Sequence, residues 1–175
     1  MPDPTTTERF RALVDRHQRE LAAFREPFQR PGMGFSMVSD ADLHRKLALT
    51  AGQPQILGQG WTSGTSAGSN ASYSVYIANP GTQSYFPMFV TMFFGLANFA
   101  PDIIEGFEGR DLAWPYRTTE RFTLAAGANV TKTFNYVVPP GTGGNTYTGN
   151  AVVWAGNWHD IGTYCDRGLF DITVS

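Results

Sequence analysis

Hydrophobic residues near the start of the chain recur at the spacing of an amphipathic helix. Between residues 7 and 26 they alternate by four and three positions, which places them along one side of a helix. Pro27 would end this helix, because proline has no backbone N–H to donate. A similar spacing predicts a second, short helix over residues 40–50. We therefore expect a helical arm over residues 1–52, whose apolar side carries Phe10, Val14, His17, Leu21, Phe24 and Phe28.

Beyond Gly52 the spacing changes from about 3.6 residues to two, which is typical of strands. Around residues 71–77, for example, apolar side chains alternate with serine and tyrosine. Such segments follow one another at short spacing, at about 55–61, 71–77, 85–94, 121–124, 130–138, 146–158 and 168–174. This succession predicts a mainly β protein: an immunoglobulin-like antiparallel β-sandwich of about seven strands over residues 53–175, with an N-terminal helical arm.

The turns of the second half of the chain have a particular chemistry. In FTLAAGANVTKTFNYVVPPGTGGNTYTGNAVVW, a Leu-x-x-Gly turn precedes one alternating strand and a Val-Pro-x-Gly turn precedes another. The earlier YSVYIANPGTQ ends a strand in an Asn-x-Gly turn. Over residues 55–175 the sequence thus resembles a bacterial immunoglobulin-like domain of the CARDB (cell-adhesion-related) kind. The resemblance implies a non-catalytic sandwich used in adhesion, spacing or assembly, usually outside the cell.

The predicted strand over residues 85–94 is apolar on both of its faces. One face carries Phe86, Met88, Val90, Met92 and Phe94, and the other carries Tyr85, Phe89 and Phe93. A two-layer sandwich buries only one face of each strand, so the second face needs a cover. The arm could provide one in two ways. On its own sheet it would be the lid of a monomer, whereas on a neighbouring subunit it would build an oligomer.

The distribution of charge favours the oligomer. Residues 47–101 contain no Lys, Arg, Asp or Glu, and strands without such charges aggregate unless they are reliably covered. We therefore expect a structural or interaction module that forms a homo-oligomer or docks to a protein partner. The predicted interface consists of Phe10, Val14, Leu21, Phe24, Tyr85, Phe89 and Phe93.

Tryptophans suggest an alternative function. Trp154 and Trp158 share one side of the predicted strand over residues 146–158, about 13 Å apart at the usual rise per residue. Exposed, the two rings would form a platform on which sugars stack, and the chain would be a carbohydrate-binding module. Covered, the same rings would be packing surface.

Two motifs raise a third function, that of a serine or cysteine hydrolase. Ser66 lies in Gly64-Thr65-Ser66-Ala67-Gly68, which matches the G-x-S-x-G pattern of serine hydrolases. A nucleophile of this type sits between a buried strand and a helix, yet glycines surround Ser66 and a strand follows it. Cys165 lies near His159, Asp160 and Asp166, which we interpret as a polar loop between strands. We expect no catalytic residue.

Composition excludes several classes of partner. The 13 Lys and Arg against 15 Asp and Glu leave no general basic patch for nucleic acid. One cysteine rules out an intrachain disulfide, and no apolar run reaches the length of a membrane helix. The acidic segment Asp102–Asp111 lacks the ligand spacing of an EF-hand, so no metal or cofactor is predicted. The N-terminus does not resemble a signal peptide, which favours the cytoplasm or a particle released by an unconventional route.

Overall fold

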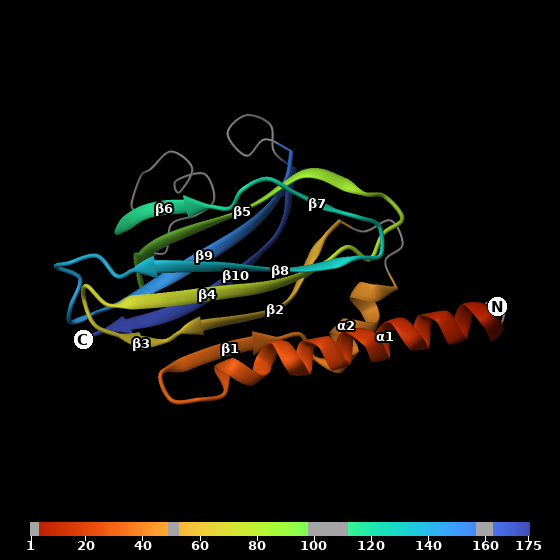
Figure 1. The fold of residues 1–175 in the computed structure, drawn as a ribbon, viewed down its shortest axis with the longest axis horizontal. Coiled ribbons are helices and arrows are strands. Elements are labelled where there is room, and N and C mark those ends of the chain that lie inside the picture. The colour runs from red at the N-terminus through yellow and green to blue at the C-terminus, as the bar shows by residue number, and fades with distance from the viewer. Residues whose placement is uncertain (1–3, 49–52, 98–111, 157–162) are drawn as a thin grey trace.

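The computed structural model describes residues 4–48, 53–97, 112–156 and 163–175. Two β-sheets face each other in these residues, and a long helix runs along the outside of one of them (Figure 1). Sheet A has the strand order β1-β2-β4-β8. Sheet B has the order β3-β10-β9-β5-β6, and β7 also pairs with β5. The predicted sandwich is therefore confirmed.

The helices are α1 (Pro4–Arg25), the 3-10 turn η1 (Glu26–Phe28) and α2 (Asp40–Leu47). Sheet A consists of β1 (Met33–Met37), β2 (Gln55–Thr62), β4 (Asn70–Ala78) and β8 (Asn129–Val137). Sheet B consists of β3 (Gly64–Thr65), β5 (Tyr85–Leu96), β6 (Trp114–Thr118), β7 (Phe122–Leu124), β9 (Asn145–Ala155) and β10 (Thr163–Val174). Among the strand pairs of the described residues, only the short one between β3 and β10 is parallel.

All seven predicted strands are present, and β1, β3 and β6 were not predicted. The strand β1 lies within the segment that the sequence assigns to the arm. It pairs with β2 from Met33 opposite Thr62 to Met37 opposite Gly58. The arm segment therefore contributes an edge strand to sheet A as well as two helices.

The main core lies between the sheets and follows the predicted alternation. On β4, Tyr73, Val75 and Ile77 face the core, and none of the three has exposed surface. On β9, Ala151 and Val153 point to the same core from sheet B. Burying one such large side chain contributes on the order of 1.5–3 kcal/mol, so this double layer dominates the stability of the sandwich.

A second core lies between α1 and the outer face of sheet A. Its buried members are Val14, Leu21, Leu43, Leu47, Leu57, Tyr76 and Ala78. Two glycines of β2 permit the close approach of the helices: a Cβ on Gly58 would lie 3.2 Å from Leu21 Cδ2, and one on Gly60 would lie 2.3 Å from the Phe28 ring. The arm thus packs on its own sheet, which is the lid arrangement.

The two faces of β5 differ from the prediction at their N-terminal end. Met88, Val90, Met92 and Phe94 face the main core as expected, and Tyr85 packs against it as well. Phe86, predicted to share their face, is exposed instead. The pairing of β5 with β7 shifts register between Tyr85 and Met88. Because the side-chain period of a strand is two, such a shift exchanges the faces of the residues before it.

Candidate functional site

The predicted protein interface does not form one surface. Val14 and Leu21 are buried against sheet A, and Phe10 and Phe24 pack beside them. Tyr85 lies against the main core on the other sheet. The apolar seam of the arm is therefore occupied within the chain, because burial against sheet A leaves it little surface for a partner.

The outer face of sheet B carries a third, smaller core. Phe93 is 0% exposed and groups with Val152 and Trp154, and Phe89 and Leu112 pack against them. The arm does not cover this face, since α1 lies on the opposite sheet. Phe93 on the second face of β5 is therefore covered, as expected. The helix α1 does not provide this cover.

The two tryptophans of the carbohydrate hypothesis have different outcomes. Trp154 lies on the predicted side of β9, yet it is only 6% exposed. Little of its ring remains for a sugar to stack on. Trp158 lies outside the described residues, and so does the acidic segment Asp102–Asp111.

Ser66 lies in the exposed turn between β3 and β4. Its hydroxyl is 2.8 Å from the hydroxyl of Ser69, with which it shares a hydrogen bond. Gly68 in the same turn has a positive φ of 82°, which glycine adopts without strain. No helix follows, so the strand-to-helix elbow of a serine hydrolase is absent at this motif.

Cys165 is buried in the main core. Burial raises the pKa of its thiol from 9.0 to about 11, while a backbone hydrogen bond from Ala155 has a smaller, opposite effect. The thiolate is the nucleophilic form of cysteine. At neutral pH the side chain is therefore a protonated, packed thiol.

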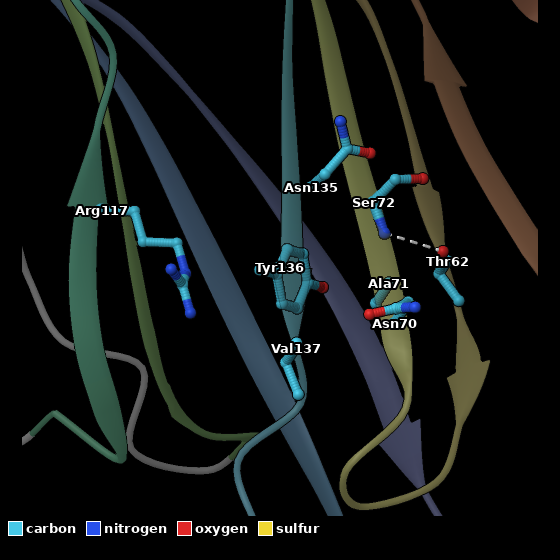
Figure 2. Close-up of a pocket in the computed structure, with 8 residues that line it drawn as sticks. All are labelled: Thr62, Asn70, Ala71, Ser72, Arg117, Asn135, Tyr136 and Val137. Carbon is cyan, nitrogen blue, oxygen red and sulfur yellow. Dashed lines mark hydrogen bonds between the residues drawn. The ribbon is translucent and has the colours of Figure 1, made fainter.

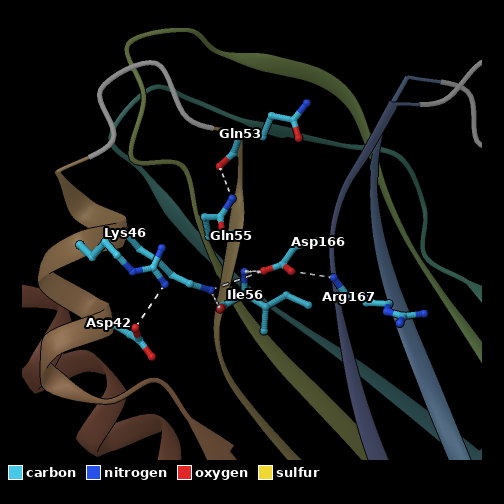
Figure 3. Close-up of polar contacts among 8 residues, drawn as sticks. Asp42, Lys46, Gln53, Gln55, Ile56, Asp166 and Arg167 are labelled. Atoms are coloured by element: carbon cyan, nitrogen blue, oxygen red, sulfur yellow. Dashed lines mark hydrogen bonds and ion pairs between the residues drawn. The ribbon is translucent and has the colours of Figure 1, made fainter.

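Polar contacts close the sandwich on the side where β2 meets β10. The carboxylate of Asp166 accepts a 2.9 Å hydrogen bond from the backbone N–H of Ile56, and Lys46 of α2 lies 3.7 Å from the same oxygen (Figure 3). Lys46 also donates to the Ile56 carbonyl at 3.3 Å. Both strands change register here, at Ile56/Gly58 and at Tyr164/Asp166. The bulges and the carboxylate together join α2, β2 and β10.

A buried amide continues this closure between the sheets. The Gln59 side chain accepts a 2.7 Å hydrogen bond from the Tyr73 hydroxyl and donates one of 3.0 Å to the carbonyl of Leu169. Gly168 leaves room for it, since a Cβ there would lie 2.4 Å from the Gln59 oxygen. On this side, therefore, the two sheets are held together by direct hydrogen bonds.

The opposite side, where the end strands β8 and β6 face each other, contains a cleft. Its volume is about 660 Å³. Figure 2 shows Arg117 on β6 across from Tyr136 on β8, with the start of β4 and the end of β2 alongside. The lining residues are Thr62, Asn70, Ala71, Ser72, Arg117, Asn135, Tyr136 and Val137. In the part of the chain that the structure describes, the lining thus combines amides, hydroxyls and one guanidinium group.

Two lining residues have unusual environments. The Arg117 guanidinium carbon lies 5.8 Å from the centre of the Tyr136 ring, a cation–π contact. The Tyr136 hydroxyl is buried and has no hydrogen-bond partner among the described residues. Burial raises the pKa of Tyr136, and Arg117 only partly opposes that effect. The hydroxyl is therefore protonated at neutral pH and can donate.

Within the described residues, no three His, Cys, Asp or Glu side chains gather in a way that would hold a metal ion. In the same part of the chain, no helix combines the length and apolarity needed to cross a membrane.

Comparisons with known proteins support the fold. No protein-family model and no curated protein matches the sequence. Among solved structures, the C-terminal domain of wzt is similar with a TM-score of 0.56 at 12% identity, covering 83% of this chain and 80% of that one. At this identity the likeness shows a shared fold.

Two further structures have lower TM-scores. The CARDB domain of the PF1109 protein from Pyrococcus furiosus, solved in complex with di-metal ions, matches with a TM-score of 0.43 at 18% identity, over 70% of this chain and 90% of that one. A beta-glucuronidase from glycoside hydrolase family 2 matches with a TM-score of 0.41 at 9% identity, over 62% of this chain and 10% of that one. A CARDB domain is thus among the solved structures to which this chain is similar.

The cleft residues were missed by the sequence analysis. Arg117 and Tyr136 are 19 positions apart and lie on different sheets, so no local spacing connects them. The one available signal was Tyr136 on the core-facing side of its strand, which is a position where a hydroxyl needs a partner.

Proposed function

We propose that this protein is a non-catalytic binding module that holds a short carbohydrate chain in the cleft between β6 and β8. The observation that supports this most is the set of side chains around the cleft. Amides such as Asn70 and Asn135 and hydroxyls such as Thr62 and Ser72 both donate and accept hydrogen bonds. The hydroxyls of a sugar do the same, so the two surfaces are complementary.

Charge refines the class of sugar. Among the described residues that line the cleft, Arg117 is the only one that carries a charge. A guanidinium group binds a carboxylate through two parallel hydrogen bonds, which makes it a preferred partner for acidic groups. We therefore infer a preference for sugars that carry a carboxylate, such as uronic acids, over neutral ones.

Titration of the intact chain with neutral and uronic-acid oligosaccharides tests this proposal. Trp114 can report binding by fluorescence, because its ring lies 5.9 Å from that of Tyr136 beside the cleft. We expect Arg117→Gln to weaken binding of the acidic sugar about tenfold or more, because the loss of even one of the two charge-assisted hydrogen bonds has an effect of this size. Arg121→Gln, which changes an exposed arginine outside the cleft, is the matched control.

Two outcomes contradict the proposal. If neither class of oligosaccharide binds, the cleft does not take carbohydrate. If the acidic sugar binds with equal affinity to the Arg117 and Arg121 variants, the ligand lies elsewhere on the molecule.

Self-association is a second candidate, which the edge strand β1 favours. Its sequence, Met-Gly-Phe-Ser-Met, contains no charge, and in the described residues it pairs only with β2. Phe35 on this strand is 41% exposed. Uncharged edges of this kind pair readily with another copy. The mass of the intact chain in solution tests the idea: a dimer that Phe35→Lys converts to a monomer would support it, and a monomeric wild type would exclude it.

A further inference from the structure

A histidine is buried beneath the arm, where α1 meets sheet A. His17 is 2% exposed, and its ring packs edge-on against Tyr76 of β4. The other histidine of the described residues, His44 on α2, is exposed. A buried imidazole is costly to charge, so its surroundings decide whether it carries a proton.

Hydrogen bonds around His17 fix its protonation state. The Tyr76 hydroxyl donates its single proton to the Glu20 carboxylate at 2.7 Å. His17 Nδ1 lies 2.6 Å from the same hydroxyl oxygen and must therefore be the donor in that contact. A neutral imidazole has only one N–H, so Nε2 is the acceptor of the Arg16 N–H at 3.2 Å. The chain of bonds from Arg16 through His17 and Tyr76 to Glu20 is complete only with neutral His17.

This chain of bonds connects the arm to two parts of sheet A. Arg16, His17 and Glu20 all belong to α1, and Tyr76 belongs to β4. Arg16 also donates to the carbonyl of Gly127, which precedes β8, at 3.0 Å. Breaking the contact between Arg16 and His17 would therefore affect the attachment of α1 to Tyr76 as well as its attachment to the Gly127 carbonyl.

We propose that the docking of α1 on sheet A is a pH-responsive contact, in which protonation of His17 loosens the arm. A proton on Nε2 would turn the acceptor of the Arg16 N–H into a second donor. It would also place a positive charge next to the Arg16 guanidinium in a buried position. Release of the arm would expose the apolar outer face of sheet A around Leu57, Tyr76 and Ala78.

Charged groups near His17 act on its imidazole in opposite directions. Burial, and after it the charge of Arg16, disfavours the protonated imidazole, whereas Glu20 favours it, and the balance lowers the pKa of His17 below its ordinary value of 6.5. The contacts between α2 and α1 do not involve His17. Gln18 Nε2 donates to Asp40 Oδ1 at 3.4 Å, and the His44 ring packs against Phe10. Desolvation of the imidazole therefore dominates.

The direction of the pH response follows from this pKa. In the released arm His17 has its ordinary pKa of 6.5, and in the docked arm the pKa is lower. The released state therefore binds the proton more tightly, and docking weakens as the pH falls below about 6.5. One proton is taken up, so the docking equilibrium changes by at most about tenfold per pH unit. At pH values well above 6.5 the docking equilibrium does not change with pH.

Hydrogen exchange of the intact chain at pH 7.5 and pH 5.5 tests the proposal. After correction for the intrinsic effect of pH, we expect opening of α1 to increase severalfold, up to about tenfold, at the lower pH. Amides of the central strand β9 serve as an internal reference. His17→Gln, whose amide can donate and accept but does not titrate, should abolish the response. His44→Gln, which changes the exposed histidine, should retain it.

Two results would overturn the inference: an arm in the wild type that opens equally at both pH values, or a response that persists in His17→Gln. If the arm of the glutamine variant is already open at pH 7.5, an NMR titration of the His17 imidazole in the wild type tests the proposal instead. His17 must then titrate below its ordinary value of 6.5, and arm opening must follow the His17 curve. Titration of His17 at or above 6.5 would exclude the proposed switch.

Discussion

Shortening Leu21 to alanine would show how much the arm contributes to the fold. Leu21 is 5% exposed, and its Cδ2 lies close above Gly58 of β2. Replacing Leu21 by alanine removes three side-chain carbons and leaves a cavity between α1 and β2. Substitutions of this kind cost about 2–5 kcal/mol, from lost transfer free energy and from the cavity that remains. For a chain of this length the expected fall in Tm is about 4–20 °C.

Leu169→Ala is the matched control, because it deletes the same atoms from a leucine that is 50% exposed. We expect it to lower the free energy of unfolding by about 1 kcal/mol or less. Comparing the two variants separates the burial of Leu21 from the general effect of removing a leucine side chain.

Urea unfolding followed by two signals is the appropriate assay. Circular dichroism at 222 nm reports α1, and tryptophan fluorescence reports the sandwich, because α1 contains no tryptophan. If arm and sandwich unfold together, Leu21→Ala moves both curves by the same amount. If the arm unfolds separately, only the dichroism curve moves. The described packing of the arm would be refuted if, in both signals, Leu21→Ala lowered the free energy of unfolding no more than Leu169→Ala does.

Two further predictions concern the main core. Gly149→Ala would place a Cβ 2.2 Å from the Phe170 ring, and we expect this overpacking to cost about 1–3 kcal/mol. An unchanged denaturation midpoint would contradict it. Cys165 is buried with its pKa raised to about 11, so at pH 8 a disulfide reagent should modify the native chain at least about a hundredfold more slowly than the urea-unfolded chain. Equal rates in the two states would show that the thiol is accessible.

Local patterns predicted the elements and their inward faces well. The alternation at Tyr73, Val75 and Ile77 identified the core side of β4, and the spacing of Val14 and Leu21 identified the buried side of α1. Such patterns are reliable because the backbone geometry of a strand or helix fixes which residues share a face. They say nothing about the element that covers the face.

Predictions that depended on a distant segment were incomplete. Trp154 was placed on the correct side of β9, but its exposure depends on what packs over that side. Phe86 and Tyr85 exchanged environments because β5 shifts register against β7, a feature that belongs to a pair of strands. The strand β1 is short and forms by pairing with β2, so its own five residues give only a weak signal.

Periodicity along the chain was enough to predict the fold class, seven of the strands and an amphipathic arm that needs a partner surface. The folded chain shows that this surface is the outer face of sheet A, where Gly58 and Gly60 let the helices approach. It also placed Arg117 across from Tyr136 and joined His17 to Tyr76. Periodicity is a property of one segment, whereas a cleft or a buried hydrogen bond requires two segments that are brought together by folding.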